Sequence, residues 1–145
     1  MYLNSHAELI EACADVGVYS PVPVIKKAIK EASNSYLAIF DSPPGISCSF
    51  IATVENADYV ILVTEPTPFG LNDLKLSMET LQQLKKPFGV IVNRSGLSNR
   101  EVYDWLKENK ITLLMEIPFD REIARIYSEG LLLVEEKPAY QLQFK

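Results

Sequence analysis

Short apolar runs alternate with amphipathic segments along this chain. Three runs, at residues 36–40, 59–63 and 88–92, each end in a polar or proline-containing stretch. Because they are too short for core helices and show no regular polar alternation, we expect them to be strands of a parallel sheet buried on both faces. A fourth strand is expected at residues 112–117, where Pro118 ends it.

Helices are expected between these strands. Apolar residues recur at helical spacing in four segments, which are residues 23–34, 71–84, 99–109 and 121–129. Asp120 can cap the last of these helices, and a further short helix is expected at residues 5–15. Strands alternating with helices predict an α/β fold with a doubly wound, mostly parallel sheet. With about four strands, that sheet would be smaller than most open α/β sheets.

The carboxyl ends of the expected strands carry the candidate chemistry. Ligands of doubly wound sheets bind outside these ends, so we expect Asp41, Glu65 and Asn93 on one rim. A carboxylate such as that of Asp41 can hold Mg²⁺ through water, and the glycine at position 45 lets a backbone N–H approach a terminal phosphate. Taken without the turn that follows it, Asp41 is equally consistent with helix capping or loop closure.

Composition limits the class of protein. A chain of 145 residues, 48% hydrophobic and 23% charged, is expected to form a single domain over residues 1–145 with a loosely held tail at about 135–145. The net charge of -5 argues against broad nucleic-acid binding. No apolar run is long enough to span a membrane, so we do not expect stable membrane insertion. The expected location is the cytoplasm. Cys13 and Cys48 are expected to be free, partly buried thiols.

Four segments together resemble a known family. They read DSPPGISC at residues 41–48, ADYVILVTEPT at 57–67, FGVIVNR at 88–94 and IPFD at 117–120. In this order and spacing they resemble successive motifs of MinD/ParA-type P-loop ATPases. The resemblance covers roughly residues 17–134. It is closest to the branch that carries an inserted ferredoxin-like domain with two 4Fe–4S clusters.

The resemblance implies a role for each candidate residue, with ATP and Mg²⁺ as cofactors. Asp41 would be the Walker B aspartate that holds the metal, and it would act with Gly45 in catalysis. The other implied nucleotide-site residues are Pro43 and Pro44 of switch II, Glu65 and Pro66 of the site floor, Asn93 and Arg94 at the adenine, and Pro118 and Asp120 bordering the base.

The chain also departs from the family pattern. It has no GKGG-like or GK[ST]-like string, and it has neither a recognisable switch I aspartate nor the ferredoxin cysteines. Without the glycine-loop cradle and its lysine, most of the binding and stabilisation of a triphosphate is lost. We therefore expect a carboxy-terminal portion, from a fragment, a split protein or a miscalled reading frame, that is nearly inactive alone. Its partners would be ATP or ADP and either a second copy or a complementing upstream half, which would also hold the 4Fe–4S clusters.

Other classes of function remain open. The chain could be a non-catalytic interaction module that keeps the fold and binds a partner subunit through its sheet edge or switch loop. A receiver-like phosphoacceptor would use Asp41 and Thr64, but it needs a lysine where this chain has Asn93 and Arg94. A GTPase is disfavoured because the stretch after Asn93 lacks an acidic residue to accept from the guanine amine.

Overall fold

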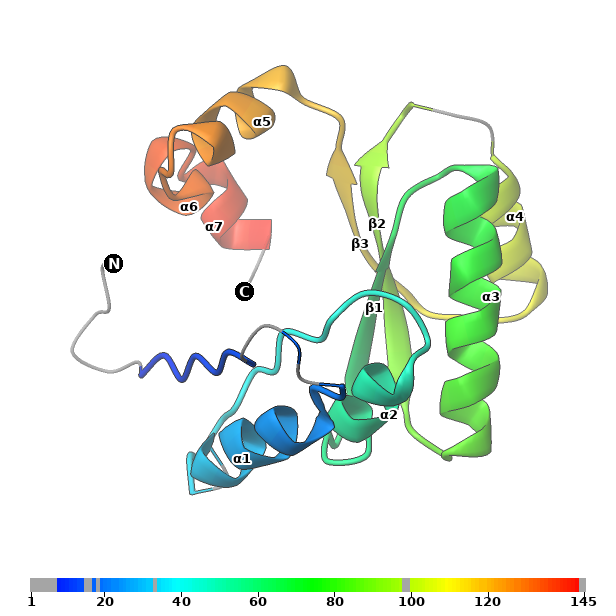
Figure 1. Ribbon diagram of the computed structural model, residues 1–145. Coiled ribbons are helices and arrows are strands. Elements are labelled where there is room, and N and C mark those ends of the chain that lie inside the picture. The colour runs from blue at the N-terminus through cyan, green and yellow to red at the C-terminus, as the bar shows by residue number, and fades with distance from the viewer. Residues whose placement is uncertain (1–7, 15–16, 18, 33, 98–99, 144–145) are drawn as a thin grey trace. The chain divides into compact units, whose positions relative to one another are not determined.

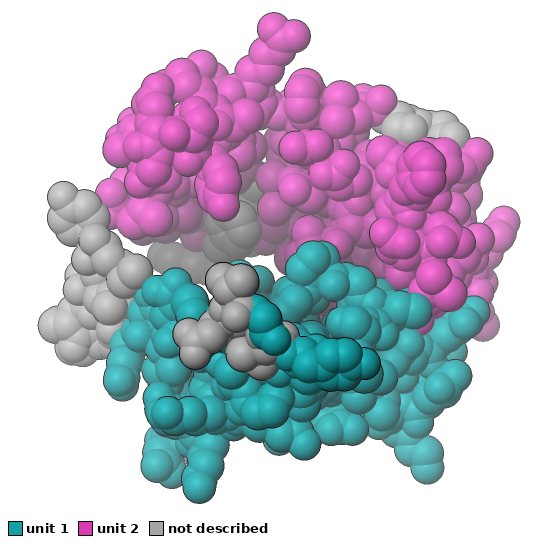
Figure 2. Space-filling model, in the orientation of Figure 1, with its two compact units in different colours: residues 1–60, 77–87 teal, residues 61–76, 88–145 magenta. Residues whose placement is uncertain are grey.

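The computed structural model describes residues 8–14, 17, 19–32, 34–97 and 100–143. The chain divides into two compact units (Figure 2). The first unit contains residues 1–60 and 77–87, and the second contains residues 61–76 and 88–145. Two elements, β1 and α3, contribute residues to both units.

A small parallel sheet organises the second unit. Its three strands are β1 (Val60–Thr64), β2 (Phe88–Ser95) and β3 (Leu113–Pro118), in the order β1-β2-β3. Strands β2 and β3 pair in parallel, with Val92 opposite Glu116. The predicted α/β class with a parallel sheet is confirmed, with three strands in the sheet where about four were expected.

Helices α3 (Pro68–Gln83) and α4 (Glu101–Glu108) lie on the same side of this sheet (Figure 1). These helices and the strands contribute most of the buried apolar residues of the second unit, which include Leu62, Leu74, Val90, Val92, Val102 and Leu106, and α5 (Arg121–Ser128) adds Ile126. The ammonium of Lys75 lies 5.4 Å from the centroid of the Trp105 ring, which joins α3 to α4 at their surface. The hydroxyl of Tyr103 in α4 donates a hydrogen bond of 3.0 Å to Glu116 of β3.

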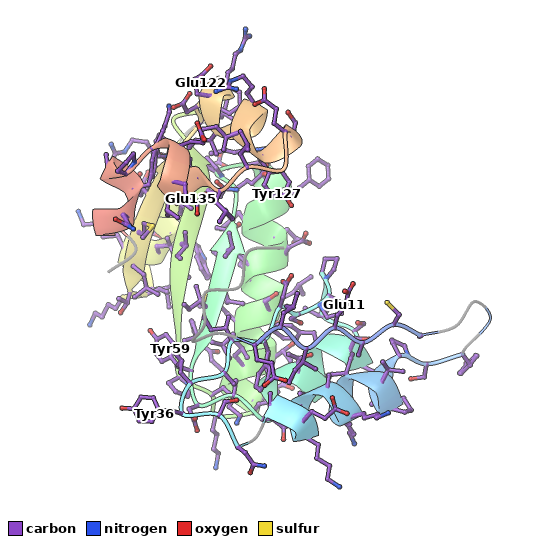
Figure 3. The ribbon with its side chains drawn as sticks, turned by 90° about the vertical axis from the view of Figure 1, so that its left-hand side faces the viewer. Glu11, Tyr36, Tyr59, Glu122, Tyr127 and Glu135 are labelled. Carbon is purple, nitrogen blue, oxygen red and sulfur yellow. The ribbon has the colours of Figure 1, made fainter. Side chains whose placement is uncertain are left out.

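On the opposite face of the sheet, the side chains of β1 are exposed. Along β1 the side chains alternate, so that Leu62 is buried whereas Ile61 is 54% and Val63 is 62% exposed. Figure 3 is viewed from this side, opposite α3 and α4. The prediction of strands buried on both faces is therefore wrong for β1. Successive side chains point to opposite faces, and in the described part of the second unit α3 and α4 both cover the same face.

Three consecutive helices follow β3, namely α5 (Arg121–Ser128), α6 (Leu133–Glu136) and α7 (Ala139–Gln143). The predicted cap is confirmed, because Asp120 accepts a hydrogen bond of 2.8 Å from the backbone N–H of Glu122. Residues 135–143, expected as a loosely held tail, lie within or beside α6 and α7.

The first unit is helical. It contains α1 (Val22–Ala32), α2 (Cys48–Val54) and residues 77–83 of α3. The ammonium of Lys86 donates to the carbonyls of Glu55 at 2.7 Å and Ala57 at 3.0 Å, which satisfies carbonyls beyond the end of α2. The buried apolar side chains of this unit include Phe50, Ala52, Val54, Met78 and Leu81.

The strand predicted at residues 36–40 does not form. Tyr36, Leu37 and Ile39 are 108%, 76% and 88% exposed, and Figure 3 shows Tyr36 pointing outward. A strand needs a neighbour that pairs with its N–H and C=O groups, and the three-stranded sheet does not include this segment. An apolar run in the sequence is therefore not sufficient to form a strand.

Two further predictions about the first unit are wrong. Residues 8–14 are irregular where a helix was predicted, and the rest of that segment, residues 5–7 and 15, lies outside the described residues. A helix of that length is marginal unless one of its faces packs. Cys13 and Cys48 are free thiols as predicted, but both are exposed where partial burial was expected. Cys48 opens α2, a helix that the sequence pattern did not indicate.

Candidate functional site

The predicted site residues fall into two groups. Residues 41–45 belong to the first unit, whereas the candidates on the strand ends, from Glu65 to Asp120, all belong to the second.

In the first unit, Asp41 lies exposed within the irregular segment that precedes α2. Pro43, Pro44 and Gly45 follow it and are exposed as well. Gly45 has a φ of 86°, and a side-chain carbon added there would meet no atom within 4 Å. The positive φ favours glycine, and the open space leaves the backbone accessible to a ligand.

The exposed carboxylate of Asp41 fits a Mg²⁺ site of the kind found with nucleotides. Mg²⁺ keeps several waters and takes one or two carboxylates together with phosphate oxygens. Among the described residues no group of three or more His, Cys, Asp or Glu side chains could hold a metal.

In the second unit, the turn from β1 into α3 is tightly built. The hydroxyl of Thr64, which is 7% exposed, donates a hydrogen bond of 2.9 Å to the carbonyl of Gly70. The backbone N–H of Gly70 in turn donates to the hydroxyl of Thr67 at 3.0 Å. Pro66 is fully buried, and Glu65 is half-buried. This turn positions Glu65 at the carboxyl end of β1.

The end of β2 carries the next two candidates. Arg94 has a φ of 54°, in the left-handed region, and its backbone N–H donates a hydrogen bond of 2.9 Å to Oδ1 of Asn93. The Arg94 guanidinium forms an ion pair of 3.3 Å with the carboxylate of Glu65. The structure thus brings Glu65, Asn93 and Arg94 together at the ends of two adjacent strands, as the sequence predicted.

The end of β3 adjoins the end of β2, because the backbone N–H of Phe119 donates to the carbonyl of Ser95 at 3.0 Å. This bond places Pro118 and Asp120 near the β2 end. The two oxygens of Asp120 are both engaged, one by the N–H of Glu122 and the other by Lys137 at 2.7 Å. These hydrogen bonds, first that from Lys137 and then that from the backbone, lower the pKa of Asp120. The carboxylate is therefore fixed in place at the start of α5.

Sequence reasoning did not assign a structural role to Thr67 and Gly70. A side-chain carbon at Gly70 would collide with the Glu65 carbonyl and would lie 3.0 Å from the Thr64 hydroxyl. The signal was present, since a glycine in the first turn of a helix, three residues after a threonine, has poor helix propensity and calls for a packing reason. What it could not reveal was the atom that requires the glycine.

A parallel sheet with its polar residues gathered at the carboxyl ends is the architecture of the P-loop NTPases, here in incomplete form. The solved structures that resemble the chain include the MinD cell division protein of Aquifex aeolicus, with a TM-score of 0.65, 26% identity, and coverage of 84% of this chain and 57% of that one. The cell division ATPase MinD of Pyrococcus furiosus is similar at a TM-score of 0.65 and 25% identity, over 79% of this chain and 50% of that one. The MinC:MinD complex of Aquifex aeolicus, with a TM-score of 0.66 and 24% identity over 81% and 52% of the two chains, shows the same fold.

Two curated proteins also resemble the chain in sequence, and one of them is a minD homolog. The uncharacterized protein MJ0579 of Methanocaldococcus jannaschii is 33% identical over 99 residues, which are 68% of this chain and 34% of that protein. The chloroplastic minD homolog of Arabidopsis thaliana, a septum site-determining protein, is 31% identical over 123 residues, which are 77% of this chain and 36% of that protein. The chain thus spans about a third of the length of these relatives. No family model matches it.

Together these similarities support membership of the MinD/ParA superfamily. In the described part of the chain, no helix combines the length and the apolar character needed to cross a membrane.

Proposed function

We propose that this chain supplies part of the ATP-binding and ATPase domain of a MinD-like P-loop protein. The observation that carries the proposal is the MinD fold over about four fifths of the chain, with Asn93 at the carboxyl end of β2 beside Glu65 and Arg94. Ligands of such sheets bind at these strand ends. An amide is also the group that pairs with both the acceptor and the donor of an adenine edge.

The residues would divide the work. Asp41 would hold Mg²⁺, and the backbone of Gly45 would contact the terminal phosphate, with Pro43 and Pro44 fixing the turn. Asn93 would bind the adenine, with Arg94, Glu65, Pro66, Pro118 and Asp120 around it. Bound Mg²⁺ would neutralise charge on the phosphate oxygens. A phosphate-binding loop with its lysine would have to come from outside these 145 residues, because no such string occurs in them.

The proposal is tested by titrating the ¹⁵N-labelled chain with MgATP and following its amide signals. We expect weak binding that shifts the Asn93 side-chain signals and the backbone signals of residues 41–45, without measurable hydrolysis. Asp41→Asn and Asn93→Ala should each weaken the response. Asp73→Asn, an exposed carboxylate on α3, is the matched control and should not. Shifts confined to other surfaces would refute the proposal. Mg²⁺-dependent turnover that Asp41→Asn abolishes would refute the claim that the site is only partial.

The finer family assignment and the location are also proposals. Association with 4Fe–4S clusters rests on the resemblance to the branch with the inserted ferredoxin domain, and the clusters would be bound by residues outside these 145. Location in the cytoplasm is likewise a proposal. Iron and sulfide analysis of complexes purified with the native protein tests the first point. Clusters bound by the 145-residue chain alone would contradict it.

A second function, binding of a partner subunit, is favoured by the exposed apolar side chains of Ile61 and Val63 on β1. Apolar patches on a folded domain commonly mark interaction surfaces. The partner would be a second copy of the chain or the polypeptide that carries the phosphate-binding loop. If binding were the only function, Asp41→Asn and Asn93→Ala would leave complex formation and biological activity intact, whereas charged residues at positions 61 and 63 would abolish both.

A further inference from the structure

We propose that the ion pair between Glu65 and Arg94 holds the Asn93 amide in one orientation and thereby makes the site select adenine over guanine. The inference rests on the proposed function, because it takes Asn93 as the residue that meets the base. In it Glu65 and Arg94 are positioning residues, which act on the nucleotide through Asn93.

The first step is the hydrogen bond between neighbours. The Arg94 N–H lies 2.9 Å from Oδ1 of Asn93, and only the oxygen of the amide can accept from it. Rotating the amide by half a turn would place its NH₂ group against the same N–H, two donors facing each other. The orientation of Asn93 is therefore set by the backbone of Arg94.

The backbone conformation of Arg94 directs its N–H toward the side chain of Asn93. Arg94 has a φ of 54°, which a residue with a side chain adopts at a cost, and Gly96 two residues later has a φ of 92°. The guanidinium of Arg94 forms an ion pair of 3.3 Å with Glu65, whose own position is set by the turn that Thr64 and Gly70 build. The ion pair joins the end of β2 to the end of β1, so it favours the left-handed conformation over the alternatives.

Adenine and guanine differ in the hydrogen-bonding groups that they present to the Asn93 amide. Adenine offers an acceptor and a donor side by side, which match the NH₂ and the oxygen of one amide. The corresponding edge of guanine offers two acceptors, so an amide with a fixed oxygen must place that oxygen against one of them. An amide that rotates freely can turn its oxygen away and present only its NH₂ group. Fixing Asn93 therefore penalises guanine more than it helps adenine. The oxygen keeps a second lone pair for adenine.

The lock is tested first without nucleotide, by hydrogen exchange of the Arg94 amide in the ¹⁵N-labelled chain. Losing one hydrogen bond is expected to speed its exchange about fivefold in Asn93→Ala, whereas Asn93→Asp, which keeps an acceptor oxygen, should exchange slowly. Glu65→Gln should speed it more than Glu122→Gln, which removes an exposed ion pair of similar length, 3.2 Å to Arg125. Equal exchange in the wild type and Asn93→Ala would overturn the lock.

Selectivity is tested by the ratio of the dissociation constants for GTP and ATP, measured from the Asn93 side-chain signals. Removing an exposed ion pair is expected to lower this ratio about two- to fivefold in Glu65→Gln, with a smaller change in the ATP constant itself. Arg94→Ala, which removes the ion pair and still has a side chain that disfavours the left-handed backbone, should lower the ratio in the same way, and Arg94→Lys, which keeps a cation for Glu65, should keep most of it. An unchanged ratio in both Glu65→Gln and Arg94→Ala would overturn the selectivity role.

The two experiments separate the inference from the proposed function. If neither nucleotide shifts the Asn93 signals at millimolar concentration, nucleotide binding by this chain and its selectivity both fail, while the exchange rates still decide whether the amide is locked. If both nucleotides bind and the ratio is insensitive to Glu65, the proposed function stands and the selectivity role fails.

Discussion

The hydroxyl of Thr64, the last residue of β1, donates a hydrogen bond of 2.9 Å to the carbonyl of Gly70 in the first turn of α3. This contact folds the chain back on itself within six residues. It holds Glu65 and Pro66 at the carboxyl end of the strand, and Thr67 completes the turn by accepting from the Gly70 N–H. The position of Glu65 beside Arg94 thus depends on the Thr64 hydroxyl and on Gly70, although neither takes part in the ion pair.

Gly70→Ala should destabilise the second unit. The added carbon would collide with the Glu65 carbonyl and lie 3.2 Å from the Glu65 nitrogen, both backbone atoms of the turn. Because overpacking of this kind costs about 1–3 kcal/mol, it should outweigh the better helix propensity of alanine. Urea unfolding measures the change. Asn72→Ala, at an exposed position on the same helix, is the control and should be neutral or slightly stabilising. A more stable Gly70→Ala chain would contradict the close approach.

Thr64→Val should cost about 1 kcal/mol of unfolding free energy, since it replaces a buried hydroxyl donor by a methyl group of similar size. Thr64→Ser keeps the hydroxyl and should preserve the turn, although it loses a methyl group from the interior. The Gly70 and Glu65 amide signals report the turn directly. If the valine variant were the more stable of the two and kept these signals, the hydrogen bond would have no role in the turn.

Asp120 should titrate at an unusually low pH. Its pKa is lowered, first by the hydrogen bond from Lys137 and then by that from the Glu122 N–H. The hydrogen bond with Asp120 in turn raises the pKa of Lys137. A lowered folded-state pKa stabilises the fold above the ordinary Asp value of about 4, and this contribution is lost as the pH falls through the folded pKa. The Lys137 contribution is present below the ordinary Lys value of about 10.4 and is lost as the pH rises through its raised pKa.

The measurement is a carboxyl-carbon NMR titration of Asp120. Lys137→Met should raise the Asp120 pKa and weaken the acid dependence of stability. Lys110→Met, which changes an exposed lysine elsewhere in the second unit, should do neither. An Asp120 pKa that is the same in the wild type and in Lys137→Met would show that the ion pair does not persist in solution.

The bare face of β1 should make the isolated chain self-associate. Ile61 and Val63 are each more than half exposed, and burying such side chains against another copy removes apolar surface from water. Sedimentation velocity should show a concentration-dependent increase in mean mass that the double substitution Ile61→Lys and Val63→Lys reduces. Tyr127→Lys, at a residue of α5 that is 85% exposed and that Figure 3 shows pointing outward, should leave association unchanged. A monomer at all concentrations would contradict the prediction.

Much of the fold could be predicted because its signals are local. The runs that become β1, β2 and β3 are bounded by turn residues, and the spacing of apolar residues identified α1, α3, α4 and α5. Boundaries moved by a few residues: α3 begins at Pro68 where residue 71 was expected, and β2 continues to Ser95 where residue 92 was expected. The apolar run at residues 36–40 was misleading because strand formation depends on a partner strand, which a local pattern does not supply.

The candidate site likewise has features that the sequence predicted and features that it did not. Its residue types and their places at strand ends were legible in the sequence, because a parallel sheet gathers the carboxyl ends of its strands at one edge. The orientation of Asn93, the ion pair of Glu65 with Arg94, and the engagement of Asp120 by Lys137 were not.

The sequence by itself determined which segments could be strands and helices and which polar groups would stand at the strand ends, because periodicity, caps and turn residues act over a few positions. Only the tertiary structure decided that Arg94 takes a left-handed backbone beside Glu65, that Gly70 must lack a side chain, and that β1 leaves one face exposed. Each of these features depends on which atoms come into contact across a turn or between separate segments. Such contacts are determined by packing and excluded volume in three dimensions.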